Sequence, residues 1–480
     1  MEVLHGVSAV FDDPNLVSCA ELVPVLALAE RAGLGTLVAE HLRLPGPAGA
    51  NARAKVTALV AGMVAGADSI ADMDLLRHGG MGRLLAGVRA PTTLGTYLRA
   101  LTFGHVRQLD AIASRFLVNL AQVTPLLVGA DQVAYLDIDD TIRATYGNKM
   151  QGAGFGYSGV KGLNALLAIV STPTAAPVIA ATRLRKGSTN SAKGAARVLA
   201  DALVTARKAG ASGLVTVRAD STYYNHDVIA AARRAGARFS VTAGMNPAVR
   251  RAITTIPESA WVDIKYPNAI WDEQVGGGVS DAQVAETSFT AFTSRKKSEH
   301  ITARLIVRRV KWLNPTSVPA GQGEMFTTWR HRAVFTDSPL GMLPAEATHR
   351  DHAIVEQVIA DLKAGPLAHL PSGSFSANGA WTVLAAIAFN LTRATGALAS
   401  KFHAKARPAT IRAQLITVPA RIARSARRVC IHLPEHWPCE HAWNALHTAA
   451  CGPTRPGHEL TTQPPAARPR TPKWKSRADR

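Results

Sequence analysis

The sequence has few acidic residues, few cysteines and few aromatic residues for its length. Its 480 residues include 34 Asp and Glu against 54 Lys and Arg, and 47% of them are hydrophobic. A chain this hydrophobic can bury a large core, which excludes a largely disordered protein. Its four widely spaced cysteines exclude a disulfide scaffold, and its composition excludes collagen-like and coiled-coil proteins. We therefore expect a large basic globular protein with roughly three structural units.

The sequence offers no pattern typical of a secretory signal or a membrane span. Its N-terminus lacks a basic region followed by an apolar run. The most apolar stretch, 163–182, contains two prolines and is predicted to form two strands around a turn. We expect a cytoplasmic protein with reduced thiols. Paired C-x-x-C spacing is missing from the only cluster that could suggest structural zinc, which comprises Cys430, Cys439, His441, His447 and Cys451.

Much of the formal net charge of +20 lies near the C-terminus. Residues 401–480 contain 15 Lys and Arg and 4 Asp and Glu, a net charge of +11. This density favours a polyanionic partner, because each neutralised phosphate releases condensed counterions. Nucleic acid is favoured over an anionic membrane surface, since prolines interrupt any long amphipathic helix there. A solvated basic segment without a partner remains an alternative.

Hydrophobic periodicity predicts a helical first region and an α/β second region. Residues 1–130 carry helical stripes and are expected to bind DNA, with Arg99 as a candidate contact, although an ordinary helical bundle fits equally well. Residues 131–245 alternate between short β-rich runs and helical segments in the order βββαβαβ. That order is typical of the first part of a ribonuclease H-like fold. The predicted strands are 133–139, 163–170, 178–184, 214–219 and 239–243, and the predicted helices are 193–208 and 227–235.

Three further regions complete the predicted organisation. Residues 246–345 hold strand-like runs between Gly- and Pro-rich connections, which indicates a β-rich insertion. Residues 346–400 return to helical patterns and would supply the last helices of the α/β core. Residues 401–480 form the expected basic C-terminal tail. The predicted fold class is therefore α/β, with a ribonuclease H-like core that is interrupted by a β-rich insertion.

Acidic residues are scarce, and three places where they occur suggest a site. Asp137 and Asp139 alternate onto one face of a predicted strand, which is hard to explain unless a cation lies nearby. Asp220 follows an apolar strand, where ligand-binding residues of α/β folds often lie, although a cap of the next helix explains it equally well. Glu356 shares a face of the predicted helix 351–363 with Lys363. Three carboxylates suit two Mg²⁺ ions about 4 Å apart, which promote in-line displacement at phosphorus.

Several motifs occur in a characteristic order along the chain. They are the D-x-D-x-T segment from Asp137 to Thr141, the Gly-rich segment from Gly152 to Tyr157, Leu184-Arg185-Lys186-Gly187 with Asn190, Arg218-Ala219-Asp220-Ser221, and the Glu356 to Lys363 helix with Asn390-Leu391 beyond it. In this order and spacing the sequence resembles the DDE transposases of bacterial insertion sequences, in particular the IS thirteen-eighty group. The resemblance covers most of the chain.

The resemblance implies a function and a set of catalytic residues. It implies that Asp139, Asp220 and Glu356 are the catalytic triad and bind two Mg²⁺ ions, for which Mn²⁺ can substitute, while Asp137 is an auxiliary or alternative ligand. It also implies cleavage at transposon ends and strand transfer into target DNA, by a protein that is a homodimer on double-stranded DNA and lies at the nucleoid of a bacterial cell. Where related transposases often carry a Tyr and an Arg before the Glu, this chain has His349 and His352, so the phosphate contact could pass to Arg350.

Basic residues near these motifs are the predicted DNA contacts. They are Arg99, Lys161, Arg185, Arg350, Lys363, Arg424, Arg427 and Arg428. Trp271, Trp312 and Trp329 could stack on an unpaired base, although aromatic residues in β-rich regions are more often core residues. Two other functions stay open: a transposase-derived protein that binds DNA without catalysis, and a ribonuclease H-like nuclease that hydrolyses DNA without strand transfer.

Overall fold

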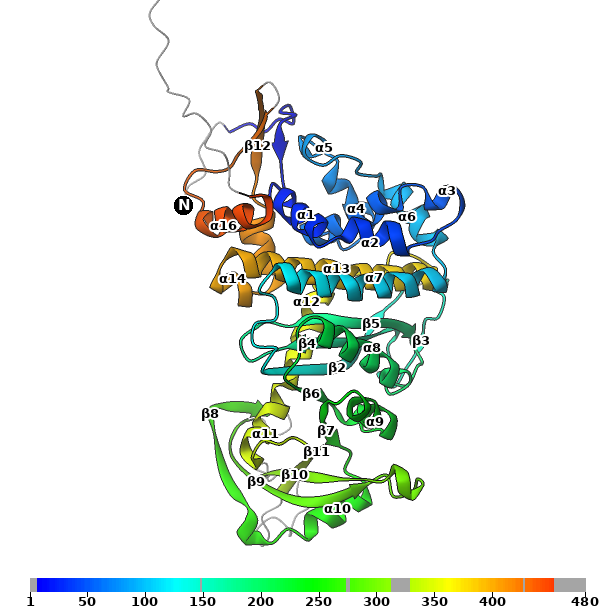
Figure 1. Cartoon of the computed structure of the whole chain (residues 1–480), viewed down its shortest axis with the longest axis vertical. Coiled ribbons are helices and arrows are strands. Elements are labelled where there is room, and N and C mark those ends of the chain that lie inside the picture. The colour runs from blue at the N-terminus through cyan, green and yellow to red at the C-terminus, as the bar shows by residue number, and fades with distance from the viewer. Residues whose placement is uncertain (1–6, 147–148, 273–276, 312–328, 426–427, 453–480) are drawn as a thin grey trace, which may run out of the picture.

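A computed structural model describes residues 7–146, 149–272, 277–311, 329–425 and 428–452. The molecule is elongated (Figure 1), with a helical layer at one end of its long axis and a long mixed β-sheet that continues to the other end. Two long helices, α7 (Phe103–Val123) and α13 (Phe375–Ala399), lie between the helical layer and the sheet.

The N-terminal part of the chain is helical, as predicted. Helices α1 and α2 meet at Gly33, whose φ of 77° lies in the left-handed region that favours glycine. The chain therefore changes direction at this residue, and α1 and α2 form two separate helices. The elements are β1 (Leu16–Val17), α1 (Leu22–Arg31), α2 (Leu34–His41), α3 (Gly46–Gly49), α4 (Ala52–Ala65), the 3₁₀ helix η1 (Ala71–Leu76), α5 (Met81–Leu84), α6 (Pro91–Ala100) and α7.

One carboxyl group in this layer is buried in an unusual way. Glu21, just before α1, has no exposed surface, and neither of its carboxylate oxygens has a hydrogen-bond partner in the described part of the chain. Burial raises the pKa of Glu21 to about 9, well above its ordinary value of 4.5. Because the folded-state pKa is the higher one, the free energy of unfolding is highest below the ordinary pKa of 4.5, where the group is protonated in both states. It falls as the pH rises from there toward 9, because only the unfolded state ionises readily.

We therefore expect Glu21→Gln to be more stable than the wild type at pH 8 by roughly 1–4 kcal/mol, because the variant has no buried carboxyl group to ionise. At pH 5 the two proteins should differ much less. Urea unfolding at both pH values measures the difference, and Glu30→Gln, in the exposed ion pair with Arg53, is the control. An equal difference at the two pH values would contradict the assignment.

The α/β core contains every strand and helix predicted between residues 131 and 245. The strands lie side by side in the order β5-β4-β2-β6-β7. Strands β2, β6 and β7 are parallel, whereas β4 is antiparallel to both β2 and β5. The elements are β2 (Val133–Ala144), β3 (Gly154–Phe155), β4 (Lys161–Ser171), β5 (Val178–Lys186), α8 (Ala195–Lys208), β6 (Leu214–Ala219), the 3₁₀ helix η2 (Ser221–Tyr223), α9 (His226–Arg234) and β7 (Arg238–Ala243).

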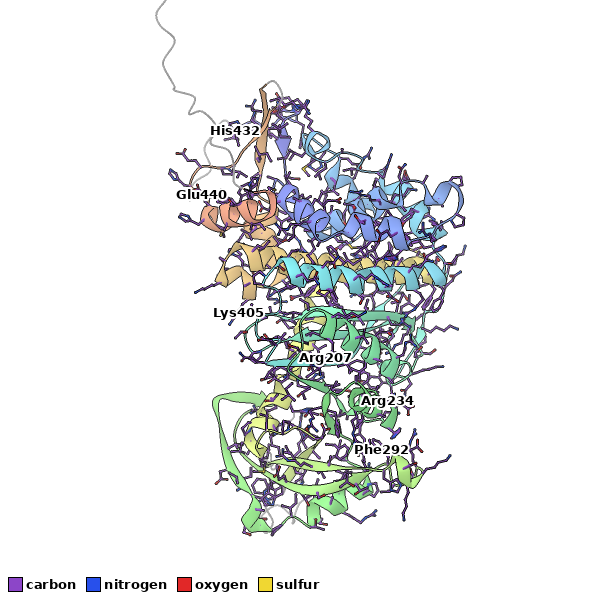
Figure 2. The ribbon with its side chains drawn as sticks, in the orientation of Figure 1. Arg207, Arg234, Phe292, Lys405, His432 and Glu440 are labelled. Carbon is purple, nitrogen blue, oxygen red and sulfur yellow. The ribbon has the colours of Figure 1, made fainter. Side chains whose placement is uncertain are left out.

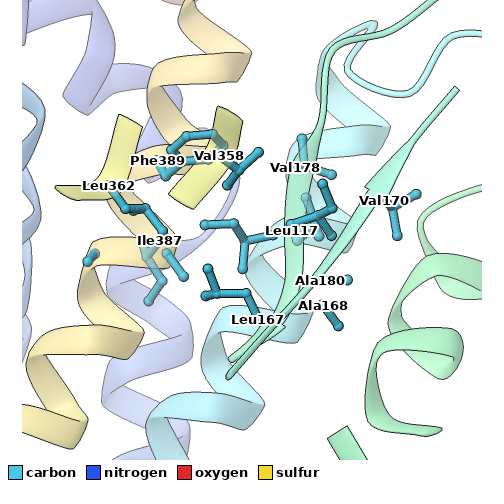
Figure 3. Close-up of a cluster of buried hydrophobic side chains, with 14 of the residues drawn as sticks. Leu117, Leu167, Ala168, Val170, Val178, Ala180, Val358, Leu362, Ile387 and Phe389 are labelled. Atoms are coloured by element: carbon cyan, nitrogen blue, oxygen red, sulfur yellow. The ribbon is translucent and has the colours of Figure 1, made fainter. Parts of the chain in front are cut away.

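Helices cover both faces of this core. Helix α8 connects β5 to β6 across one face and carries Arg207 near its end (Figure 2). Arg207 donates to the carbonyl oxygens of Ala211 and Gly213 at 2.6 and 2.8 Å. Helices α7, α12 (Ile354–Lys363) and α13 cover the other face, where Leu167 of β4 lies in the same cluster as Ile387 of α13 (Figure 3). The sheet therefore holds its central strands, β2 and β6, in fixed register between helical layers.

Helix α13 is the central core helix. It is the one helix in the described residues that is by itself long and apolar enough to cross a membrane, and 89% of its apolar window is buried inside the protein. The bent pair of α1 and α2 passes the same test only if counted as one span. The Asn390 side chain accepts from the Ile179 N–H and donates to the Ile179 carbonyl, both at 2.8 Å, so it fixes α13 to the edge of β5.

The predicted β-rich insertion continues the sheet of the core. Strand β11 (Trp329–Thr336) pairs antiparallel with β7, and β10 (Ile301–Lys311), β9 (Gly277–Ala291) and β8 (Val262–Asp272) follow in turn. Helix α10 (Pro247–Thr254) and the 3₁₀ helices η3 (Glu258–Ala260) and η4 (Lys297–Glu299) connect them. Helix α11 (Met342–Arg350) and the 3₁₀ turn η6 (Asp351–Ala353) then lead into α12.

A tryptophan of the insertion has a structural partner. The guanidinium of Arg309 lies 4.1 Å from the ring centre of Trp261 and 4.2 Å from that of Trp329, and it also pairs with Glu258. This stacking favours a structural role for Trp329 over a contact with an unpaired base. Trp312 and the side chain of Trp271 lie outside the described residues.

The C-terminal region is folded up to residue 452, whereas the sequence suggested a basic tail from residue 401. Strand β12 pairs with β1 from the other end of the chain, and Ile411, Leu415 and Leu446 are fully buried. Apolar burial thus fixes this segment onto the helical layer. Its elements are α14 (Lys401–Lys405), α15 (Pro408–Ile411), the π-helical turn η7 (Arg412–Ile416), β12 (Ala420–Ser425), β13 (Arg428–His432) and α16 (Glu440–Cys451). Residues 453–480 lie outside the described part.

Candidate active site

Two acidic residues lie side by side on neighbouring parallel strands, Asp139 within β2 and Asp220 just beyond the carboxyl end of β6. In the register of β2 and β6, Asp137 pairs with Arg218 and Ile138 with Ala219. The next residues along these strands are Asp139 and Asp220, which therefore come side by side where β6 ends. Since side chains alternate along a strand, Asp139 projects from the same face of the sheet as Asp137.

The two carboxylates are electrostatically coupled. Burial, and then the like charge of Asp220, raise the pKa of Asp139 to about 7, although the backbone N–H of Asp140 and the nearby His352 oppose the rise. The side chain of Asp220 is oriented by Thr222, whose backbone N–H and hydroxyl donate to it at 2.9 and 3.2 Å. A divalent cation would relieve the repulsion between these carboxylates, and carboxylate oxygens are ligands that Mg²⁺ prefers. The donor set therefore fits a magnesium ion.

Helix α12 packs against β2 and brings Glu356 to this side of the sheet. At 100° per residue, Glu356 and Lys363 fall within about 20° of each other around the axis of α12, and His352 lies just before this helix, in η6. Two of these residues interact with the carboxylates: His352 lies 2.9 Å from Asp137 and Lys363 is within electrostatic range of Asp139. Glu356 is exposed and lies between them in the sequence. It shares a face of α12 with Lys363, the residue that lies near Asp139.

Lys363 lies near one positive and one negative side chain, Arg143 and Asp139. Burial and the positive charge of Arg143 lower the pKa of Lys363, whereas Asp139 acts in the opposite direction. Lys363 is only half-buried, so its ammonium group can reach solvent or a phosphate oxygen. Its position beside Asp139 is consistent with the predicted DNA contact.

The structure gives Asp137 a partner other than a metal ion. Asp137 has no exposed surface, and both of its oxygens accept from the guanidinium of Arg218 at 2.7 Å. The Nδ1 atom of His352 lies 2.9 Å from the same carboxylate. Because these contacts use both oxygens, we do not place Asp137 among the metal ligands. Arg218 therefore supplies the positive charge that the sequence predicts next to Asp137.

Arg185 forms its hydrogen bonds inside the protein. Only 7% of it is exposed, and its guanidinium donates to Asp140, Asn164 and the backbone carbonyl of Ser191. These bonds join β2, β4 and β5 on the face opposite Asp139. The predicted DNA contact at Arg185 is therefore replaced by a structural role.

His349 and His352, which stand where the transposases that the sequence resembles often carry a Tyr and an Arg, also have partners within the protein. His349 is buried between the hydroxyls of Ser240 and Thr242, at 3.0 and 2.9 Å. Burial, reinforced by the charges of His352 and Arg218, lowers the pKa of His349 to about 3, so the ring is neutral at pH 7. A neutral buried ring is a poor phosphate ligand. Arg350 is half-buried and pairs with Glu346 at 2.9 Å.

The remaining predicted DNA contacts lie far apart along the chain. Arg99 is exposed on α6, Lys161 is half-buried at the start of β4, and Arg424 is exposed on β12. Arg427 lies outside the described residues, and only the backbone of Arg428 is described, in β13. These positions place basic side chains on the sheet and on the helical layer.

The acidic residues do not form a closed metal site. Within the described ranges, no group of three or more His, Cys, Asp and Glu side chains lies close enough to hold a metal ion. The same finding covers the His and Cys residues near the C-terminus that could have suggested zinc. Ions at Asp139 and Asp220 would therefore complete their coordination with water, phosphate oxygens or a Glu356 side chain that moves toward them.

These features define an α/β protein with neighbouring carboxylates on two central parallel strands, one within β2 and one just beyond the end of β6. Residues 4–450 match the family described as Transposase DDE domain group 1. Because the match covers nearly the whole chain, the protein belongs to this family of DDE transposases. No curated protein matches the chain.

Sequence reasoning missed the Arg218 and His352 contacts with Asp137. Arg218 stands two residues before Asp220 in the same motif, and so shares a strand face with it. That spacing places it opposite Asp137 whenever Asp139 lies beside Asp220. The signal was therefore present in the two motifs, but it depended on knowing that β2 and β6 are neighbours.

Proposed function

We propose that this family member is a DNA transposase of an insertion sequence, of the IS thirteen-eighty group, that cleaves DNA at transposon ends and joins those ends to target DNA. The observation that carries the proposal is the neighbouring pair Asp139 and Asp220 on two central parallel strands, against the first of which the helix of Glu356 packs. Family membership supports a transposase. The finer assignment of the chemistry is our proposal.

The strand arrangement supports a ribonuclease H-like core. Three antiparallel strands, β5, β4 and β2, continue into β6 and β7, which are parallel to β2. The helix that follows the inserted strands, α12, returns to β2 and carries the last acidic residue. We propose that the insertion lengthens this core without interrupting its sheet.

In the proposed mechanism, Asp139, Asp220 and Glu356 would hold two Mg²⁺ ions, for which Mn²⁺ could substitute. Bound there, the ions would activate the attacking hydroxyl and stabilise the leaving oxygen. Thr222 fixes the orientation of Asp220. Lys363 would hold a phosphate oxygen beside Asp139, and the buried Asp137–Arg218 pair would keep His352 at the edge of the site.

The proposed partners are the double-stranded ends of the element and the target DNA. Arg99, Lys161, Lys363 and Arg424 remain candidate contacts, because they are exposed or half-buried. Arg350 keeps this role only if DNA displaces Glu346. We further propose a homodimer on DNA, since two ends must be paired, and a cytoplasmic location at the nucleoid.

Product analysis tests the proposal. The purified protein is incubated with Mg²⁺, labelled DNA that carries the inverted repeats flanking its gene, and an unlabelled target plasmid. A transposase yields cleaved ends and label joined to the plasmid. Cleavage without joined product would favour a ribonuclease H-like nuclease, and binding without cleavage would favour a non-catalytic DNA-binding protein.

A further inference from the structure

A stretch of sixty residues next to the proposed active site carries charge of one sign only. Residues 141–200 contain eight Lys and Arg and no Asp or Glu. Arg183 and Arg185 pair with acidic residues outside the stretch. Lys149 and Lys186, in contrast, are exposed, and Lys161 is half-buried. A surface formed by this stretch would attract a polyanion.

The hairpin between β3 and β4 lies within this stretch. Phe155 of β3 pairs with Lys161 of β4, and the Thr145 N–H, just beyond β2, donates to the Lys161 carbonyl at 3.1 Å. The hairpin closes in a tight turn in which the Gly159 N–H donates to the Gly156 carbonyl at 3.1 Å. The start of β4 is thus flanked by β3 on one side and by the end of β2 on the other.

Three aromatic side chains are exposed around this hairpin. Tyr146 is 92% exposed, Phe155 66% and Tyr157 99%. We refer to these three residues as the aromatic tip. Tyr146 follows the Thr145 contact with β4, Phe155 is in β3, and Tyr157 is in the turn. Single exposed aromatic residues are common, but several on one hairpin indicate an interaction surface.

We propose that the aromatic tip stacks on unpaired bases of DNA while Lys149, Lys161 and Lys186 hold the neighbouring phosphates. Aromatic rings bind the face of any base, and a cationic surface beside them tracks the backbone, which is how proteins bind unpaired nucleic acid. Because this stretch has no carboxylate, it fits a negatively charged partner such as DNA. It would repel a second copy of the chain, which is also basic. A role of this surface in transposition rests on the proposed function.

The tip is close enough to the proposed catalytic site to contact the same DNA. Asp139 pairs with Leu167 on β4, and Lys161 lies six residues earlier on that strand. At about 3.4 Å per residue this is a separation of about 20 Å. DNA held at Asp139 would reach the tip within roughly six nucleotide steps. The tip would therefore hold bases that become unpaired next to the cleaved end.

The test is equilibrium binding in buffer without divalent cations, with two probes: a strand of twenty thymidines and a duplex of the same length. The double variant Phe155→Ala/Tyr157→Ala should bind the single strand at least about tenfold more weakly, because two stacking contacts are lost, and should bind the duplex with little change. The conservative double variant Phe155→Tyr/Tyr157→Phe should bind both probes like the wild type. Phe402→Ala removes an equally exposed aromatic ring, 62% exposed and next to Lys401, and is the matched control.

Three outcomes would overturn the proposal. The first is unchanged binding of the single strand by the double alanine variant. The second is an equal loss with Phe402→Ala, since the effect would then not belong to the hairpin. The third is unchanged DNA binding together with loss of self-association in sedimentation, or loss of binding to phosphatidylglycerol vesicles, which would assign the tip to a second copy of the chain or to a membrane surface.

The binding assay also separates this proposal from the proposed function. It needs neither cleavage nor a divalent cation, so its result does not depend on the catalytic role proposed for Asp220. If the protein never cleaves DNA but the tip variant loses single-strand binding, the aromatic tip stands and the transposase chemistry fails. If cleavage and joining occur but the tip variant binds normally, only the aromatic tip fails.

Discussion

Replacing Asp220 with Asn is expected to lower Mg²⁺-dependent DNA cleavage by at least about 10²-fold, because a metal ligand worth several kcal/mol of transition-state stabilisation is lost. The change is nearly isosteric, and the asparagine oxygen can still accept from Thr222, so the local turn should be preserved. Cleavage of labelled DNA is measured under single-turnover conditions, with DNA binding measured in parallel. Binding should be retained.

The chain offers a matched control for this variant. Asp227 lies seven residues further on, at the start of α9, and its side chain is 66% exposed. Asp227→Asn makes the same chemical change outside the proposed site and should leave cleavage within about twofold of the wild type, as is usual for an exposed surface change. Normal cleavage by Asp220→Asn, or an equal loss in both variants, would remove Asp220 from the catalytic residues.

The largest expected effect on stability comes from Arg218→Met. Asp137 has no exposed surface and Arg218 is only 1% exposed, so removing the guanidinium leaves a carboxylate buried without its main partner. Breaking a buried pair in this way costs about 3–5 kcal/mol of the free energy of unfolding. Urea unfolding of the metal-free protein measures the loss.

Two further variants test the cause of that loss. Arg197→Met removes an arginine that is 74% exposed and pairs with Asp201, and should cost less than about 1 kcal/mol. The double variant Asp137→Leu/Arg218→Met should be more stable than Arg218→Met alone, because no buried charge is left unpaired. If Arg218→Met costs no more than Arg197→Met, the buried pair is not what fixes this part of the sheet.

Local pattern was sufficient to predict the core elements. Strand β6 coincides with the predicted segment, since an apolar run there is bounded by Gly213 and Asp220. The alternation along β2 correctly placed Asp137 and Asp139 on one face of a strand. It could not distinguish their roles, because the roles depend on the neighbouring strand: Asp137 lies opposite Arg218, whereas Asp139 lies beside Asp220.

Contacts between distant parts of the chain could not be predicted. Nothing in β11 indicates that it pairs with β7 and so extends the core sheet. The two residues of β1 pair with β12 at the other end of the sequence, which turns an expected basic tail into part of the folded protein up to residue 452. Arg185 looked like a DNA contact beside the site, because the sequence does not reveal the pocket formed by Asp140 and Asn164.

The most direct test of the account is to locate manganese by anomalous scattering in crystals of the protein with DNA. We expect two Mn²⁺ peaks about 4 Å apart next to Asp139 and Asp220, with Glu356 bound to one of the ions. Crystals of Asp220→Asn should lose at least one of the peaks. Peaks elsewhere, or an unchanged pair of peaks in the variant, would show that Asp139, Asp220 and Glu356 do not hold the two ions.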